Sequence, residues 1–171
     1  VLHLDYLGPI HGASHHKFSI LVMVDNYTGY TMLHASKGQT AEDVINAIWN
    51  VWRPIHGLPA KIISDRGTGF LNEINLKLYQ SMRIRKLFTS SYHPETNAKA
   101  ERTVQEVKKA YRMINITLDG DLTNNKRTAA ACQEIKTLLP SIQYSINQKL
   151  KRFSPFSPNM LVFGKNMNDY L

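Results

Sequence analysis

Hydrophobic and polar residues alternate at the start of the chain with the period of two that is typical of β-strands. The alternation covers residues 2–6 and predicts a strand that ends at Gly8-Pro9. Residues 18–24 form a nearly continuous apolar run, which indicates a strand buried on both faces. Turn-forming residues occupy positions 25–29, and residues 30–34 predict a third strand. Three strands joined in this way favour an antiparallel meander.

The period then changes to that of a helix. An apolar stripe at residues 41–52 predicts a helix that Thr40 caps and that Pro54 and Gly57 end. A fourth strand is predicted at residues 61–64. Because a helix between two strands makes a crossover connection, this strand is expected to run parallel to the first.

The second half of the chain predicts more helices around one further strand. Apolar positions indicate a short helix at residues 74–82, a fifth strand at residues 84–88 and a helix from about residue 97. A last stripe at residues 135–146 crosses Pro140, so it is either one kinked helix or two helices, the second starting at the proline. The sequence therefore predicts an α/β fold: a five-stranded mixed sheet flanked by helices.

Three acidic residues lie in or beside these elements. Asp5 lies in the first strand, Asp65 directly follows the fourth, and Glu101 lies one turn into a helix. Each has an ordinary explanation by itself: a polar position on an edge strand, a turn, and stabilisation by the helix dipole, respectively. If the first and fourth strands are parallel, however, both aspartates lie near the carboxyl edge of the sheet. That edge is where open α/β sheets place their sites.

The sequence around these acids resembles the catalytic core of retroviral and gypsy-type LTR-retrotransposon integrases. That family has two Asp and a Glu, and the 35 residues between Asp65 and Glu101 match its spacing. Further matches, in the family's order, are Ser64-Asp65-Arg66-Gly67 with Phe70, Tyr92-His93-Pro94 with Glu101-Arg102-Thr103, and Ser154-Pro155-Phe156 with Phe163-Gly164. Together they cover nearly the whole chain.

The resemblance implies one integrase catalytic core domain across residues 1–171, with an RNase H-like fold. The C-terminal helices, at about residues 126–150, are expected to be part of the same domain. Asp5, Asp65 and Glu101 would be its catalytic residues. The implied reactions are the trimming of the 3′ ends of the element's DNA and their joining to target DNA.

The chemistry of three carboxylates agrees with this expectation. Ligands that offer only oxygen suit Mg²⁺ or Mn²⁺, and converging carboxylates without cations repel one another. Two ions about 4 Å apart would neutralise them, activate the attacking oxygen and stabilise the leaving 3′ oxygen. We expect Asp5 to bridge both ions, and Asp65 and Glu101 each to complete one metal site.

The net charge of +8 and the pI of about 9.6 suit a DNA partner. The resemblance implies double-stranded DNA, both element ends and target, and a homodimer or higher oligomer. Residues at the family positions of Gln105 and Lys108 contact DNA ends, although Lys108 and Lys109 also fit an ordinary solvated helix face. The candidates for DNA contacts are Arg66, Lys99, Arg102, Gln105, Lys108 and Lys109.

Composition excludes several other classes. Cys132 is the single cysteine, which excludes a disulfide framework and a Cys₂His₂ zinc site and fits a reducing compartment. His11, His15 and His16 therefore fit a hairpin loop better than a zinc site. No apolar run reaches the roughly 18 residues of a membrane span, and no signal peptide is evident. A start inside a strand pattern indicates a domain of a longer polyprotein. The resemblance implies a location in the nucleus or in a virus-like particle within the cell.

The loop before Glu101 departs from the family pattern. Glu95 and Ala98 stand where the family usually has Gln and Gly, so the loop is expected to be stiffer and to carry a negative charge near DNA. A second hypothesis is therefore a domesticated integrase-like module that binds DNA or protein without catalysis. A third is another enzyme of the same fold, an RNase H or a DDE transposase. The three acids favour an enzyme, and Tyr92-His93-Pro94 favours an integrase.

Overall fold

A computed structural model describes residues 1–11, 17–65, 70, 73–88, 102–112, 129–150 and 154–165 of the 171-residue chain. The strands are β1 (Leu2–His11), β2 (Lys17–Asp25), β3 (Thr31–Ser36), β4 (Lys61–Ser64) and β5 (Arg85–Phe88). The helical segments are α1 (Ala41–Ala47), the π-helical turn η1 (Ile48–Trp52), α2 (Arg53–His56), α3 (Glu73–Ser81), the helix of residues 102–112, α5 (Ala129–Gln148) and α6 (Pro158–Phe163).

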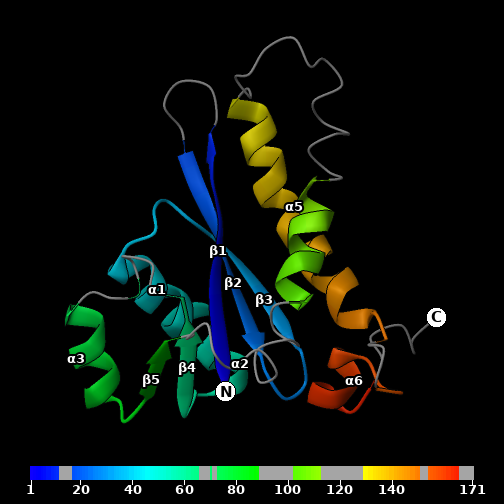
Figure 1. The fold of residues 1–171 in the computed structure, drawn as a ribbon. Helices are drawn as coiled ribbons and strands as arrows, with labels where there is room; N and C mark the ends of the chain where they lie inside the picture. Colours follow the sequence, from blue (N-terminus) through cyan, green and yellow to red (C-terminus); the bar gives the residue numbers. More distant parts are fainter. Residues whose placement is uncertain are drawn as a thin grey trace.

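The strands form one mixed sheet in the order β3-β2-β1-β4-β5, with β1 at its centre (Figure 1). β1, β2 and β3 are antiparallel neighbours, whereas β4 is parallel to both β1 and β5. The predicted meander, crossover and five-stranded mixed sheet are confirmed. Because β1 is the central strand, the edge-strand explanation of Asp5 is wrong.

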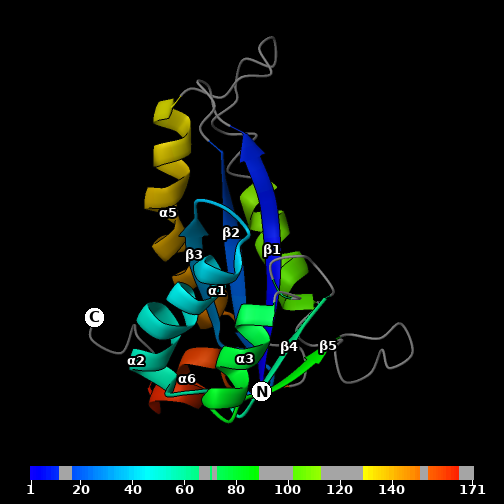
Figure 2. The ribbon, with the colours of Figure 1, turned by 90° about the vertical axis from the view of Figure 1, so that its left-hand side faces the viewer.

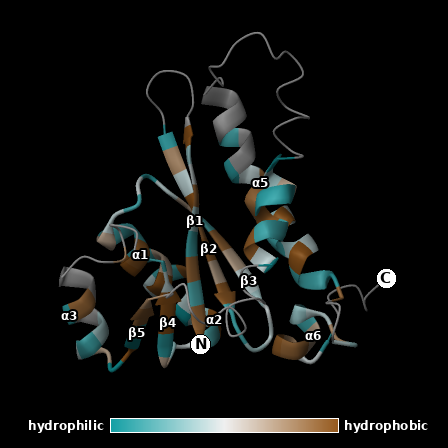
Figure 3. Cartoon of the chain, in the orientation of Figure 1, coloured by the Kyte–Doolittle hydropathy of each residue, from teal (hydrophilic) through white to brown (hydrophobic). Residues whose placement is uncertain are grey.

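Helices cover both faces of the sheet, and each face has its own hydrophobic core. α1, η1 and α3 lie on one face, where Leu21 and Ile62 are fully buried. The helix of residues 102–112 and α5 lie on the other face, against Val22 and Val24 of β2. Figures 1 and 2 show these two groups of helices on opposite sides of the strands, and Figure 3 shows the hydrophobic residues of the strands between them. Residues of β1 therefore alternate between two covered surfaces.

β1 is longer than its alternation predicted. We expected Gly8-Pro9 to end it, but the strand continues to His11 past a shift in its register with β2 before Ile10. A bulge takes Pro9, which has no N–H to donate, out of the hydrogen-bonded ladder. Gly8 has a φ of +122°, a conformation that residues with a Cβ rarely adopt.

The helix after the meander passes Pro54 instead of ending there. Thr40 and Asp43 form the predicted capping box, in which the Thr40 hydroxyl accepts from the Asp43 N–H and the Asp43 carboxylate accepts from the Thr40 N–H. α1 then widens into η1 and continues as α2, which Gly57 ends with a φ of +70°. In a regular α-helix the proline ring clashes with the carbonyl four residues earlier, and the wider π turn before Pro54 accommodates the ring.

α5 is one helix with Pro140 inside it, so the single-helix alternative is correct. Leu139, Ile142 and Ile146 face the core that lies over β2 and β3. The apolar stripe of α5 is therefore a packing face that holds the helix against the sheet.

Two amide side chains of α5 also bind the backbone of the edge strand β3. Asn147 Oδ1 accepts from the Thr31 N–H at 2.8 Å, and Asn147 Nδ2 donates to the Thr31 carbonyl at 2.7 Å. Gln143 Oε1, one helical turn earlier, accepts from the Leu33 N–H at 2.9 Å. Backbone groups that face away from β2 are thus satisfied by side chains instead of another strand.

α6 is an element that the sequence reasoning missed. The signals were present: Ser157 caps the first turn, Pro158 is its first residue, and Gly164 ends it with a φ of +71°. These signals lie in the segment that resembles the family's closing motif, Ser154-Pro155-Phe156 with Phe163-Gly164.

His3 makes stability depend on pH. It is buried in β1, and burial, followed by the nearby N-terminal ammonium, lowers its pKa from 6.5 to about 4. The folded protein therefore holds His3 neutral, so this contribution to stability is fully present above pH 6.5 and is lost as the pH falls toward 4. We expect Tm to fall over this range, and His3→Leu to make the fall shallower. An equally steep profile of Tm against pH in the variant would contradict this prediction.

Candidate active site

Asp5 faces the helix of residues 102–112. Its neighbours Leu4 and Tyr6 pack into the core on the opposite face, so alternation turns Asp5 toward this helix. Asp5 Oδ1 accepts from the Tyr6 N–H at 2.8 Å, and Asp5 Oδ2 lies 3.4 Å from Lys108 Nζ. Both charged side chains are about one-third exposed, so solvent and solutes can reach them.

Asp65 comes next to Asp5 through the pairing of β1 with β4. The parallel register joins Leu2 to Ile62 and Leu4 to Ser64. One more residue along each strand gives Asp5 and Asp65, and adjacent strands lie about 4.8 Å apart. Asp65 is exposed where β4 ends. The two aspartates are thus brought together at the carboxyl end of β4.

The helix of residues 102–112 presents the other described candidates. Val104 and Val107 anchor it in the core, while Arg102, Gln105 and Lys109 are exposed. Lys108 contacts Asp5. The remaining candidates and the family departures lie outside the described residues: Glu101, Arg66, Lys99, Glu95, Ala98, and the hairpin loop of residues 12–16. Within the described ranges, no three His, Cys, Asp or Glu side chains form a group that could hold a metal ion.

A second lysine, Lys86, contacts the residue that precedes Asp65. Lys86 Nζ donates a hydrogen bond to Ser64 Oγ. Burial lowers the pKa of Lys86 to about 8, and the Asp65 carboxylate opposes this shift. Sequence reasoning missed this residue, whose signal was a charged side chain within the short apolar pattern of residues 84–88.

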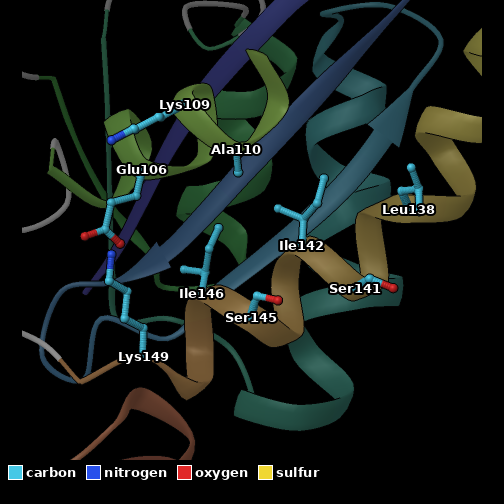
Figure 4. A pocket seen from close by; sticks show the side chains of 9 residues that line it. All are labelled: Glu106, Lys109, Ala110, Leu138, Ser141, Ile142, Ser145, Ile146 and Lys149. Carbon is cyan, nitrogen blue, oxygen red and sulfur yellow. The ribbon is translucent and has the colours of Figure 1, made fainter. Parts of the chain in front are cut away.

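A groove lies between the helix of residues 102–112 and α5 (Figure 4). Its volume is about 510 Å³. Ile142 and Ile146 line its α5 side, and Glu106 and Lys109 line the other. Lys109 therefore borders this groove, whereas its neighbour Lys108 reaches Asp5.

The family model of the integrase core domain matches residues 1–94, which is more than half of the chain and includes both aspartates. The chain belongs to the integrase core domain family. This integrase core is 27% identical over 168 residues to the Pro-Pol polyprotein of feline foamy virus, covering 97% of the chain and 13% of that polyprotein. It is also 29% identical over 108 residues to gypsy retrotransposon integrase-like protein 1 of Rattus norvegicus, covering 63% of the chain and 20% of that protein. The chain thus spans a small part of these relatives.

Solved structures agree on the fold of this integrase core. The catalytic core domain of HTLV-2 integrase in complex with magnesium, in its trimeric form, matches with a TM-score of 0.65 at 18% identity, covering 94% of each chain. The catalytic core domain of BIV integrase matches with a TM-score of 0.66 at 19% identity, covering 95% of this chain and 93% of the other. The sheet and its flanking helices are therefore RNase H-like, as predicted. No described helix has the length and apolar character needed to cross a membrane.

Proposed function

We propose that this chain is the catalytic core of an active integrase, a metal-dependent polynucleotidyl transferase. It would trim the 3′ ends of element DNA and join them to target DNA, with Asp5, Asp65 and Glu101 as catalytic residues. The observation that carries the proposal is the pairing of β1 with β4, which brings Asp5 and Asp65 together in a chain of the integrase core family.

The described carboxylates suit a divalent cation. Both offer oxygen ligands, which Mg²⁺ and Mn²⁺ prefer, and Asp5 already attracts a cation in the form of the Lys108 ammonium. We propose that Asp5, Asp65 and Glu101 hold Mg²⁺ or Mn²⁺, as two ions. Such ions would activate the attacking oxygen and stabilise the leaving 3′ oxygen.

The protein's own part is to hold the carboxylates and to orient DNA. The Tyr6 N–H holds Asp5 Oδ1, which leaves Asp5 Oδ2 toward the helix that carries Lys108. Val104 and Val107 fix that helix against the sheet, so its polar side chains have a defined position beside the aspartates. Arg102, Gln105, Lys108 and Lys109, with Arg66 and Lys99, are proposed to contact DNA, chiefly its phosphates.

We also propose the domain organisation, the partners and the cellular location of the protein. Residues 1–171 would form a single core domain, since α5 supplies part of the core over β2. Double-stranded DNA and further copies of the chain are the proposed partners; the HTLV-2 integrase core is described in dimeric and trimeric forms. We propose that the protein acts in the nucleus.

A cleavage and joining assay tests the function. A branched DNA substrate is incubated with the protein and Mn²⁺ or Mg²⁺, with a chelator as control. Strand cleavage or joining that requires the metal would support the proposed polynucleotidyl transferase activity. DNA binding without any metal-dependent cleavage, in the longer parent chain as well as in this one, would favour the domesticated binding module, which the departures at Glu95 and Ala98 allow.

Lys108→Gln is expected to tighten the binding of Mn²⁺. In the wild type the Lys108 ammonium competes with the metal for Asp5 Oδ2. A partly exposed pair of this kind is worth up to about 1 kcal/mol, so the dissociation constant should fall about two- to fivefold. The dissociation constant can be measured by electron paramagnetic resonance, which detects free Mn²⁺.

Lys109→Gln is the matched control for that variant. It removes the same charge from the next residue, which borders the groove with α5 instead of Asp5. Equal Mn²⁺ affinities in the two variants would show that Lys108 acts only through net charge and would contradict the prediction.

A further inference from the structure

Lys86 places a partly buried cation beside the end of β4. It lies in β5 opposite Ile62 of β4 and is partly buried, and this burial lowers its pKa to about 8. Burying an ammonium is unfavourable unless hydrogen bonds and charges compensate for lost hydration. The groups around Lys86 Nζ therefore indicate what this side chain does.

The polar partner of Lys86 leads directly to Asp65. Lys86 Nζ donates to Ser64 Oγ, and Ser64 Oγ donates its own hydrogen to the Asp65 carbonyl oxygen at 2.8 Å. A hydroxyl can accept and donate at the same time, so the two hydrogen bonds are compatible. They form a chain from the ammonium to the backbone of the residue that carries the exposed carboxylate.

The aromatic partners of Lys86 fix the position of its ammonium. Lys86 Nζ lies 5.2 Å from the ring centroid of Phe70 and 5.1 Å from that of Phe88, within the range of cation–π attraction. Phe70 is itself stacked on Tyr6 of β1, with centroids 5.3 Å apart and the ring planes 29° from parallel. Lys86 thus contacts Ser64, just before Asp65, and Phe70, five residues after it.

We propose that Lys86 is a positioning residue for Asp65. Its hydrogen bond to Ser64 Oγ, which in turn bonds the Asp65 carbonyl, holds the backbone of Asp65 and so orients the carboxylate for a divalent cation. Phe70 and Phe88 keep the ammonium in place. This inference rests on the proposed role of Asp65 as a metal ligand. Lys86 touches neither the metal nor the DNA in this role.

Two substitutions separate positioning from simple electrostatics. Lys86→Met removes the charge and the donor but keeps an unbranched apolar side chain of similar length. Lys86→Gln removes the charge but keeps a donor for Ser64 Oγ. Coulomb's law alone predicts tighter Mn²⁺ binding in both variants, because a nearby positive charge is lost. Positioning predicts weaker binding in Lys86→Met only.

We expect Lys86→Met to weaken Mn²⁺ binding about tenfold, the usual effect of removing a residue that orients a ligand. Lys86→Gln should bind Mn²⁺ at least as tightly as the wild type. Hydrogen–deuterium exchange at residues 61–65 should rise in Lys86→Met and stay near the wild-type rate in Lys86→Gln. Tm of Lys86→Met should not fall, because a desolvated ammonium gives way to an apolar side chain.

The outcomes distinguish this inference from the proposed function. If Asp65→Asn leaves Mn²⁺ binding unchanged, Asp65 is not a ligand, and both the proposed site and the orienting role are wrong. If Asp65→Asn weakens binding but Lys86→Met does not, the site stands and positioning by Lys86 is wrong. Unchanged exchange at residues 61–65 in Lys86→Met, or equal weakening of Mn²⁺ binding in both Lys86 variants, would also overturn it.

Discussion

Asp65→Asn is expected to abolish strand cleavage and joining while leaving Tm nearly unchanged. The Asp65 side chain is exposed at the end of β4, so its removal takes no packing from either core. As a proposed metal ligand it would contribute several kcal/mol to the transition state, which corresponds to a rate loss of about a thousandfold or more. The branched-DNA assay with Mn²⁺, together with thermal unfolding, measures both effects.

Glu42→Gln is a suitable control for Asp65→Asn. Glu42 is an exposed acid in the first turn of α1, so its substitution makes the same change in net charge away from β4. It should retain wild-type activity. Substantial residual activity in Asp65→Asn would remove Asp65 from the catalytic set.

Asn147→Ala is expected to destabilise the fold by about 3 kcal/mol, because two buried backbone groups of Thr31 lose their partners. The Asn147 side chain is almost fully buried, so water cannot easily replace it. Urea unfolding gives the change in the free energy of unfolding. Hydrogen–deuterium exchange should locate the loss at β3 and the end of α5.

Ser145→Ala is the control for Asn147→Ala. Ser145 is an exposed residue two positions earlier on α5, and alanine is a good helix former, so stability should be unchanged or slightly higher. A loss below about 1 kcal/mol in Asn147→Ala would mean that solvent satisfies Thr31 and that the amide pair is not needed.

The sheet could be predicted because its strands have strong local patterns. Residues 18–24, which are apolar except for Ser19, lie in the buried strand β2, and the crossover helix required β4 to be parallel to β1. That parallel pairing is what brings Asp5 and Asp65 together, so the proximity of the two aspartates could also be predicted. The resemblance to the family made Glu101 a further candidate, which pattern alone would have left as an ordinary helical acid; it lies outside the described residues.

Features that depend on tertiary contacts could not be predicted. The passage of β1 beyond Gly8-Pro9 requires a bulge, and the passage of the helix beyond Pro54 requires a π turn; neither leaves a periodic signal. The role of Asn147 depends on a strand 116 residues away in sequence. Lys86 is one of two charged residues in a short strand, and only the tertiary structure shows that it lies against Phe70 and Phe88.

The central position of β1 has a consequence for the order of folding. On one side β1 pairs with β2, which follows it after a short hairpin, whereas on the other side Leu2 pairs with Ile62 after the whole crossover. Closing the longer loop costs more chain entropy, and parallel pairing is slower for that reason. The meander should therefore form first, leaving one edge of β1 open until β4 docks. A fragment that ends before Lys61 would keep that hydrophobic edge exposed and would be prone to aggregate.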